Sequence, residues 1–496
     1  MKRIAIIGGG IAGVAAAFEF ILQQRAGADI EFVLFEATSR LGGTVETVRR
    51  DGFVVECGPD SWVTEKPWAR ELAIELDLES ELVASNDEKR KTYIAEDNAL
   101  IAMPDGMRMM VPTKWESVLS SPLFSEQAKL AYLREPELAE QLKANALDVG
   151  DGYRDESVRD FVGRHFGEEV ANTIAAPLLA GVFGGDIAKL SVRAVMPTFV
   201  ALEREHGSLV FGLQQRLQTG KKSAPIFTSL RSGLGALITG IESLIPERSL
   251  QRNVAVEAIE HSAGMWRIHW THGGVTHPFE ASFDAVVVAT PAATTARLLT
   301  PVDSRIGEFL PQQSSSAIVV ALGFDGDQAR SMRIPAGFGF LVRQHELPPD
   351  QGGELDANLA PEVGDDAAQQ ALLACTFLNQ KFPHTAPVGA ILLRAFFGGP
   401  SAPDLLAHDD ATLIRLARTL LERFLGKLPE PSVGLARRWP TSLPLYEVGH
   451  QERIAALDLR VAKLPNLRLI GNAYRGVGLP DLIRSGRAAA RQIVAG

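Results

Sequence analysis

Residues 3–13 read RIAIIGGGIAG, a short apolar strand that runs into a glycine-rich turn. An alanine-rich stretch from Ile11 to Gln24 follows and is typical of a helix, and a second strand is expected from Ile30 to Phe35. Glycines with this spacing allow the tight turn and let the backbone approach a pyrophosphate at the helix N-terminus. The stretch therefore predicts a dinucleotide-binding β-α-β unit.

An acidic residue, Glu36, ends the second strand. It stands 23 residues beyond Gly13, close to the place where a carboxylate accepts a hydrogen bond from a ribose hydroxyl. Strand, turn, helix, strand and terminal acid together predict an adenine dinucleotide as cofactor. The candidate cofactor-binding residues of this unit are Gly8, Gly9, Gly10, Ile11, Ala12, Gly13 and Glu36.

The turn after Glu36 narrows the choice of dinucleotide. Residues 40–44 read RLGGT. The pattern acid-x-x-x-Arg-x-Gly-Gly resembles the FAD-binding signature shared by amine oxidases, phytoene desaturases and protoporphyrinogen oxidases. The resemblance implies FAD, with Arg40, Gly43 and Thr44 near its pyrophosphate. The alternative is a glycine-rich hairpin in which Arg40 is an ordinary surface charge.

Four further segments resemble one branch of that superfamily, the porphyrinogen oxidases of haem biosynthesis. They read ECGPDS at 56–61, GVFGGD at 181–186, SLRSGL at 229–234 and GNAYRGVGLPDLI at 471–483. The branch often has Cys where Leu482 stands, which is a minor departure. The resemblance implies the flavin amine oxidase fold. This is an α/β fold that combines an FAD-binding Rossmann-like domain, a mixed-sheet substrate domain and a helical lobe.

The resemblance also implies the reaction. We expect FAD- and oxygen-dependent oxidation of protoporphyrinogen IX to protoporphyrin IX, with hydrogen peroxide formed. Flavin N5 accepts the hydride, so no catalytic side chain is predicted. The alternative is coproporphyrinogen III oxidation by the same chemistry. An amine oxidase, a carotenoid desaturase and a flavin-containing scaffold are less favoured alternatives.

The family motifs carry further site predictions onto this chain. Substrate contacts are expected at Arg90, which would pair a propionate, at Phe338, which would stack on the ring, and at Gly181. The alternatives are a solvated charge, a core aromatic and a turn glycine. Further cofactor contacts are expected at Gly58, Pro59, Asp60, Ser61, Val254, Asn472, Val477, Gly478 and Leu479.

Composition excludes several other classes of protein. The net charge of −10 over 496 residues argues against nucleic-acid binding. The two cysteines, Cys57 and Cys375, form no metal-binding or disulfide pattern, and the histidines show no zinc motif. We predict no metal. The expected partners are a porphyrinogen, molecular oxygen and a downstream haem-pathway enzyme.

No signal peptide or transmembrane run is visible, so we expect a cytoplasmic protein. An apolar patch between Met103 and Trp115 is interleaved with Arg108 and Lys114. It is interpreted first as a loop packing on its own core. The alternative is a peripheral contact with the inner face of a membrane.

The domain prediction divides the chain into three lobes. Residues 1–86, 223–300 and 435–496 would form the FAD-binding domain. Residues 87–222 would form a mostly helical lobe, which is the part that would face a membrane in the alternative interpretation. Residues 301–434 would form the substrate-binding domain. The segment 344–370 holds seven acidic residues and no lysine or arginine, which predicts an unfolded acidic insertion. Oligomeric state is left open.

Overall fold

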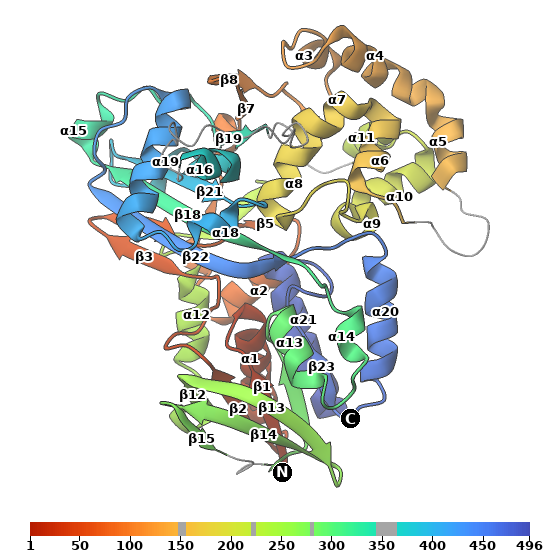
Figure 1. The fold of residues 1–496 in the computed structure, drawn as a ribbon, viewed down its shortest axis with the longest axis vertical. Coiled ribbons are helices and arrows are strands. Elements are labelled where there is room, and N and C mark those ends of the chain that lie inside the picture. Colours follow the sequence, from red (N-terminus) through yellow and green to blue (C-terminus); the bar gives the residue numbers. More distant parts are fainter. Residues whose placement is uncertain (147–154, 220–224, 278–281, 344–364) are drawn as a thin grey trace, which may run out of the picture.

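A five-stranded parallel sheet organises one end of the molecule (Figure 1). The computed structural model describes residues 1–146, 155–219, 225–277, 282–343 and 365–496. The strands, in spatial order, are β12 (Leu250–Arg252), β2 (Ile30–Glu36), β1 (Lys2–Ile7), β17 (Ala285–Val288) and β23 (Leu467–Leu469). They come from three separate stretches of chain. The β-α-β prediction is confirmed, with its helix as α1 (Ile11–Arg25).

Both faces of this sheet are covered, as parallel sheets require. One face packs against α1 and three further helices: α2 (Trp68–Glu75), α12 (Gly235–Glu242) and α21 (Leu479–Ala495). The other face packs on an antiparallel sheet and on helices α13, α14 and α20 (Ala292–Leu299, Ile306–Phe309, His450–Val461). That sheet is built from β13 (Val254–Ser262), β14 (Met265–His272), β15 (Val275–His277) and β16 (Ser282–Phe283). We call this assembly the parallel-sheet domain.

The first and last helices of the chain lie directly against each other. A side chain at Gly486 of α21 would come within 2.2 Å of the Ala12 carbonyl oxygen in α1. Glu19 of α1 is buried and bonds Arg487 and Arg491 of α21 at 2.8 Å each. Glycine is therefore required at Gly486, and the C-terminal helix fixes the helix that follows the glycine turn.

A seven-stranded sheet forms the second domain, which we call the mixed-sheet domain. All neighbouring pairs are antiparallel except β19 with β7. Helix α19 (Asp410–Leu425) covers one face. In spatial order the strands are β22 (Val433–Pro444), β18 (Ser314–Phe324), β21 (Ile391–Phe397), β20 (Leu372–Phe377), β19 (Gly339–Val342), β7 (Thr92–Glu96) and β8 (Ala99–Ala102).

Two expectations about this part of the chain are wrong. The stretch from Asn86 to Lys222 is not mostly helical at its start, because β7 and β8 belong to the mixed sheet. Strand β22 also belongs to that sheet, although residues from 435 onward were assigned to the FAD-binding domain. Strand β7 pairs with β19 and β22 pairs with β18, partners distant in sequence that local propensity does not reveal, whereas β8 forms a local hairpin with β7. We propose domain limits that place 91–103 and 433–444 with the mixed sheet.

A bundle of short helices, which we call the helical lobe, forms the third part of the molecule (Figure 1). Apart from α5, which packs on α10, its helices share one apolar core. They are α3 (Trp115–Leu119), α4 (Glu126–Arg134), α5 (Ala139–Ala146), α6 (Val158–Phe166), α7 (Glu168–Val170), α8 (Ala176–Phe183), α9 (Val192–Val195), α10 (Pro197–His206) and α11 (Leu209–Thr219). A π-helical turn at Ala171–Ala175 joins α7 to α8.

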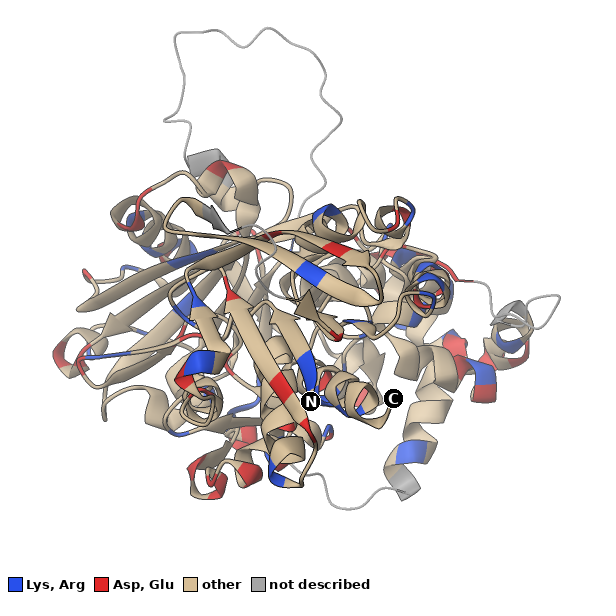
Figure 2. Cartoon of the chain, turned by 90° about the horizontal axis from the view of Figure 1, so that it is seen from below, with Lys and Arg blue, Asp and Glu red and all other residues tan. Residues whose placement is uncertain are grey.

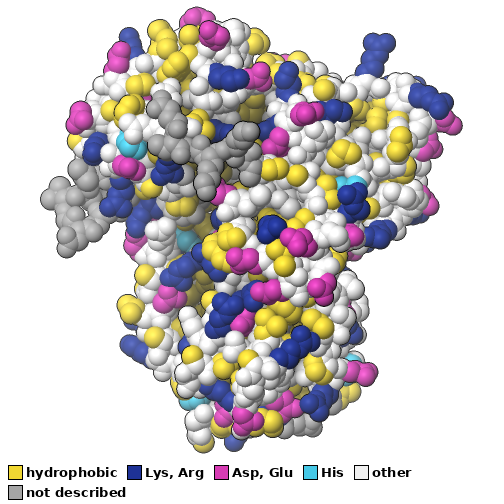
Figure 3. Space-filling model, turned by 180° about the vertical axis from the view of Figure 1, so that it is seen from behind, with side chains coloured by type: hydrophobic (Ala, Val, Ile, Leu, Met, Phe, Trp, Pro, Cys, Tyr) yellow, Lys and Arg dark blue, Asp and Glu magenta, His cyan; other side chains and the backbone are white. Residues whose placement is uncertain are grey.

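The apolar patch near Trp115 belongs mainly to the core of this lobe. Met107, Met110 and Val111 are buried, and Met103 and Trp115 pack against the same cluster. Figure 3 shows apolar, basic and acidic side chains interspersed over the rear face of the molecule. The patch is thus explained by packing, and membrane contact stays a prediction. No helix in the described part of the chain is long and apolar enough to span a membrane.

Most of the expected acidic insertion, residues 344–364, lies outside the described residues. Its last part is helical, because α16 spans Asp365–Ala371, and this differs from the expectation of an unfolded segment. Lys and Arg are interspersed with Asp and Glu over the described chain (Figure 2).

The close contact of α1 with α21 leads to a stability prediction. Gly486→Ala should destabilise the fold by about 1–3 kcal/mol, because the new methyl group meets backbone that cannot move freely. Gly240→Ala is the matched control in α12, where a side chain would meet only Leu76 at 3.4 Å. It should be neutral or stabilising by up to about 1 kcal/mol. Urea denaturation measures both. Equal stability of the two variants would contradict the close-contact argument.

Candidate flavin and substrate site

The N-terminus of α1 is open to an anion. No side chain caps it, and no acidic residue lies in its first turn. Gly8 adopts φ +104°, and a side chain at Gly13 would come within 2.0 Å of the Gly8 carbonyl oxygen. Nothing lies within 4 Å of the place where a side chain of Gly10 would be. The turn therefore leaves free N–H groups and open space where a pyrophosphate would bind.

Glu36 lies beside this turn at the end of β2. Its carboxylate accepts hydrogen bonds from the Gly9 N–H and the Thr38 N–H, each at 2.8 Å. Strand β12 pairs with β2 up to Arg252 beside Glu36, which brings Val254 to the same edge. The structure thus gathers the turn, the acid and Val254, all of which were predicted to bind the cofactor.

The Arg40 guanidinium is not a free cation, because it is already bonded to backbone carbonyl groups of its own turn. Its guanidinium donates to the carbonyls of Leu41 at 3.1 Å and Val45 at 3.2 Å, and also to Gly43. It lies over the Trp439 ring at 5.5 Å. Gly43 comes next to Gly10 of the first turn. Arg40 therefore shapes the second glycine turn, and its direct contact with a pyrophosphate stays a prediction.

The loop Gly58–Ser61, predicted to lie along the flavin, is held by side chains from the mixed sheet. Lys381 and Arg394 donate to the two oxygens of the Asp60 carboxylate at 2.8 and 2.9 Å. Arg394 also donates to the Gly58 carbonyl, and the Trp439 indole donates to the Cys57 carbonyl at 2.8 Å. This loop is thus a point where the two domains are bonded together.

The charges at this loop are buried. Arg394 is fully buried, and Lys381 is 8% exposed. Burial raises the pKa of Asp60, but the charges of Lys381 and Arg394 outweigh it and lower that pKa to about 2. Burial raises the pKa of Glu56 to about 7, although its carboxylate accepts from the Leu234 N–H and the Thr47 hydroxyl. Asp60 is therefore the permanent anion at this junction.

The C-terminal motif forms the start of α21. Gly478 is the N-cap residue, and no side chain caps the helix. Asn472 is held through both its side chain and its backbone. Its side-chain amide donates to the Ser442 carbonyl, and its backbone carbonyl accepts from the Tyr446 hydroxyl. Asp481, in the first turn, is ion-paired with Lys66 at 2.5 Å. Val477, Gly478 and Leu479 thus present a second uncapped helix end, and their flavin contacts stay predictions.

One face of the mixed sheet runs between the other two parts of the molecule. At one end its residues Ala321 and Leu435 pack on the β3–β4 hairpin (Thr47–Arg50, Phe53–Glu56) of the parallel-sheet domain. At the other end Ile94 and Leu341 pack on the helical lobe. Cross-strand pairing puts Val319, Phe396 and Ala374 on the same face, between those ends.

These three central residues belong to neither packed cluster. Phe396 is half-buried, and the Arg394 guanidinium lies 4.9 Å from its ring centre. The centre of the face is therefore apolar without being part of the packed core, and it lies beside the loop that contains Asp60. This is a suitable place for a flat apolar substrate next to a flavin.

The three predicted substrate contacts lie at the edge of this face. The Phe338 N–H donates to the Lys91 carbonyl at 2.8 Å, which brings Phe338 next to the segment that carries Arg90. Phe338 is 8% exposed and outside the packed clusters, whereas Arg90 is exposed. Gly181 lies in α8, which contacts β19 and β20, and nothing occupies the position of its missing side chain. Their substrate roles stay predictions.

Sequence reasoning missed Lys381, Arg394 and Phe396. One signal was present: Arg394 is the only charged residue in ILLRAFF, residues 391–397. A charge within an otherwise apolar strand is costly unless a buried partner exists, so it could have been singled out. Lys381 and Phe396 carry no comparable local signal.

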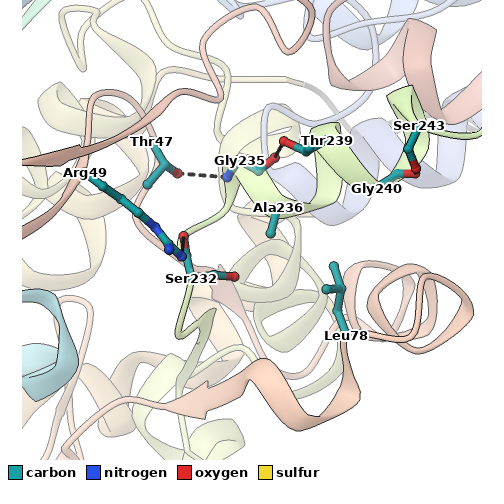
Figure 4. Close-up of a pocket in the computed structure, with 9 residues that line it drawn as sticks. All are labelled: Thr47, Arg49, Leu78, Ser232, Gly235, Ala236, Thr239, Gly240 and Ser243. Atoms are coloured by element: carbon teal, nitrogen blue, oxygen red, sulfur yellow. Dashed lines mark hydrogen bonds between the residues drawn. The ribbon is translucent and has the colours of Figure 1, made fainter.

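A separate pocket of about 480 Å³ lies on the outer side of the parallel-sheet domain (Figure 4). Its lining includes Thr47, Arg49 and Ser232 beside α12. The Gly235 N–H there already bonds the Thr47 hydroxyl at 2.8 Å. None of the predicted cofactor or substrate residues lines it, so we do not assign it to the flavin or the substrate.

Comparison with known proteins identifies the family. The flavin-containing amine oxidoreductase family matches residues 11–494. The chain belongs to this family. Coproporphyrinogen III oxidase of Bacillus subtilis is 31% identical, over 98% of this chain and 97% of the relative. The Staphylococcus aureus enzyme of the same name is 28% identical over 100% and 99%. Protoporphyrinogen oxidase 2 of Arabidopsis thaliana is 24% identical over 99% and 94%.

Solved structures agree with this assignment. A structure described as a protoporphyrinogen oxidase from Exiguobacterium matches with a TM-score of 0.80 and 31% identity, over 100% of this chain and 99% of the other. A putrescine oxidase shares the fold, with a TM-score of 0.65 at 16% identity, covering 100% and 99% of the two chains. The predictions of the flavin amine oxidase fold, of an FAD-dependent oxidoreductase and of FAD itself are confirmed.

The site fits FAD on the structure's own evidence. The uncapped N-terminus of α1, the open space at Gly10 and the carboxylate of Glu36 supply an anion site and a ribose acceptor in one place. The flavin, when bound, supplies the redox chemistry. No group of three or more potential metal ligands occurs in the described part of the chain.

Glu36 gives a direct test of the adenosine contact. Glu36→Ala should weaken FAD binding by about 1.5–3 kcal/mol, which is roughly ten- to a hundredfold in Kd. The loss reflects a charge-assisted hydrogen bond to the ribose. Titration of the apoprotein with FAD measures it. Glu31→Ala, on the same strand, should bind FAD normally. An unchanged Kd for Glu36→Ala would remove Glu36 from the cofactor site.

Asp60 gives a pH prediction. Its pKa falls from an ordinary 3.8 to about 2 on folding, which corresponds to about 2 kcal/mol of stability. Because the folded pKa is the lower one, this stability is present above pH 4 and is lost as the pH falls through 2. Acid unfolding of Asp60→Asn should therefore show a shallower loss of stability between about pH 4 and 2. An acid limb identical to that of the unmodified protein would contradict the ion-pair account.

Proposed function

We propose that the protein is an FAD-dependent oxidase that converts coproporphyrinogen III to coproporphyrin III in haem biosynthesis. Molecular oxygen is the electron acceptor and is reduced to hydrogen peroxide. Each oxidation step removes a hydride from a bridging carbon and a proton from a ring nitrogen. The chain itself binds the macrocycle, orients it and excludes water.

The observation that carries the proposal is the full-length similarity to coproporphyrinogen III oxidases. Six of these relatives, all bacterial, are 28–31% identical, whereas the plant protoporphyrinogen oxidases are 24–26% identical. The sequence alone favoured protoporphyrinogen IX, and this comparison favours the alternative. Protoporphyrinogen IX remains the second candidate, because the Exiguobacterium structure and the plant relatives carry that name.

The positive charge around Arg90, at the edge of the apolar face of the mixed sheet, supports a substrate rich in carboxylates. Arg90 makes no ion pair or hydrogen bond with another described side chain, and its neighbours Lys89 and Lys91 are also basic. Burial lowers the pKa of Arg90, and so does the charge of Arg108 nearby. A bound propionate would relieve that repulsion. Coproporphyrinogen III carries four propionates and protoporphyrinogen IX carries two, so the basic edge suits the former better.

Turnover of the two purified porphyrinogens tests the assignment. We expect kcat/KM at least about tenfold higher for coproporphyrinogen III, since one additional charge-assisted contact contributes about 1.5–3 kcal/mol. Growth of porphyrin fluorescence, with hydrogen peroxide measured in parallel, gives the rates. A preference for protoporphyrinogen IX would reverse the assignment. Oxidation of an amine with both porphyrinogens untouched would reject it.

Arg90 tests the carboxylate contact. Arg90→Ala should raise KM by about ten- to a hundredfold with little change in kcat, because a propionate remote from the reacting carbon is bound similarly in ground and transition states. Arg90→Lys should recover part of the loss, since it keeps the charge without the fork geometry. Arg330→Ala, an exposed arginine paired with Asp327, is the control. Unaltered KM in Arg90→Ala would leave Arg90 as a solvated charge.

A further inference from the structure

The buried ion cluster of Lys381, Asp60 and Arg394 has more positive than negative charge. Two cations bond one carboxylate, so the cluster carries one excess positive charge. The titratable groups beside Arg394 also include the thiols of Cys57 and Cys375 and the carboxylate of Glu56. Burial raises the pKa of both thiols, which keeps them neutral. The Glu56 oxygens are bonded by Thr47 and Leu234, and neither cation bonds to them. An unbalanced charge is costly to bury, so its presence indicates a negative partner that the chain itself does not supply.

In the same loop the backbone carbonyl groups are hydrogen-bonded, but several backbone N–H groups are not bonded within the described chain. Its carbonyl groups are bonded, since Trp439 donates to Cys57, Arg394 to Gly58 and the Ser229 hydroxyl to Asp60 at 2.8 Å. The N–H groups of Gly58, Asp60 and Ser61 have no acceptor among the described residues. The loop is thus fixed from the mixed-sheet side and leaves its donors free for a ligand with acceptor atoms.

Lys381 and Arg394 are both held in fixed positions. The Lys381 amine lies 4.3 Å from the Phe227 ring centre and also donates to the Ser61 hydroxyl at 3.0 Å. The Arg394 guanidinium bonds two groups of the loop and faces the Phe396 ring. Neither cation can move to solvent without breaking these contacts. The positive charge therefore stays at the loop whatever the state of the cofactor.

We propose that Lys381, Asp60 and Arg394 are positioning residues that hold the Gly58–Ser61 loop against the flavin, and that their excess positive charge raises the flavin's reduction potential. Reduction adds negative charge to the flavin, and a buried cation stabilises the reduced form more than the oxidised one. The inference rests on the flavin cofactor and is independent of which porphyrinogen is oxidised.

The test is the reduction potential of the FAD-loaded protein, measured anaerobically against a reference dye. Lys381→Met leaves the cluster neutral and should disfavour reduction by about tenfold, which is ~30 mV for a two-electron couple. Asp60→Asn doubles the excess charge and should shift the potential upward. Lys381→Arg keeps the charge and should leave the potential unchanged.

The double variant Lys381→Met with Asp60→Asn separates charge from structure. It restores one excess positive charge, so its potential should return close to that of the unmodified protein. A cluster that acted only through loop structure would make the double variant the most perturbed of all. Arg460→Met removes a cation paired with Asp303 on the far side of the parallel-sheet domain and serves as the control. The proposal is supported if the reduction potential is lowest in Lys381→Met, intermediate and equal in the unmodified protein and the double variant, and highest in Asp60→Asn.

Other outcomes overturn it. Shifts of the same sign in Lys381→Met and Asp60→Asn, or shifts no larger than in Arg460→Met, would show that the charge does not act on the flavin. If Lys381→Met fails to fold, the double variant and Lys381→Arg still decide. Potentials that differ from that of the unmodified protein in both of these charge-conserving variants would reject the electrostatic role.

Discussion

The ion pairs of Asp60 with Lys381 and Arg394 are the constraint on which the rest of the site depends. They join a loop of the parallel-sheet domain to two elements of the mixed sheet, and all three side chains are nearly or fully buried. Breaking a buried ion pair on one side is strongly destabilising, because it leaves a charge without its partner. The two domains are therefore held at one fixed distance where the Gly58–Ser61 loop meets the mixed-sheet domain.

This constraint places one face of the mixed sheet beside the Asp60 loop. Helix α19 covers one face, and the other face extends from the junction with the parallel-sheet domain to the helical lobe. The apolar centre of that face, at Val319, Phe396 and Ala374, lies between two packed clusters. Its outer edge carries Arg90 and Phe338. An apolar surface with a basic edge matches a flat macrocycle that carries carboxylates only on its periphery.

How much the sequence could predict depends on the range of the interactions. The β-α-β unit and Glu36 are local, since their contacts lie within one short stretch of chain, and they were predicted with ends correct to about one residue. Strand β7 pairs with β19, far away in the sequence, and although Thr92, Tyr93 and Ile94 favour a strand, so short a run does not reveal that partner. It was therefore taken as part of a helical region.

The site shows the same division. The loop Gly58–Ser61 was recognised from a motif, whereas Lys381 and Arg394, which hold it, were not. Their role arises only when β21 and α17 (Leu378–Lys381) are folded against that loop. Arg40 shows the converse, because its motif suggested a phosphate contact and the structure shows it bonding the carbonyls of its own turn. Motifs thus locate a site better than they assign roles within it.

The central claim is that a porphyrinogen bound on the apolar face of the mixed sheet transfers its electrons directly to the flavin held at the Asp60 loop. Anaerobic rapid mixing of the FAD-loaded protein with coproporphyrinogen III tests this most directly. The account predicts that the flavin absorbance bleaches as porphyrin forms, in a fixed ratio, and that admitting oxygen restores the colour and yields hydrogen peroxide. Flavin that stays oxidised while coproporphyrinogen III is present would contradict the account.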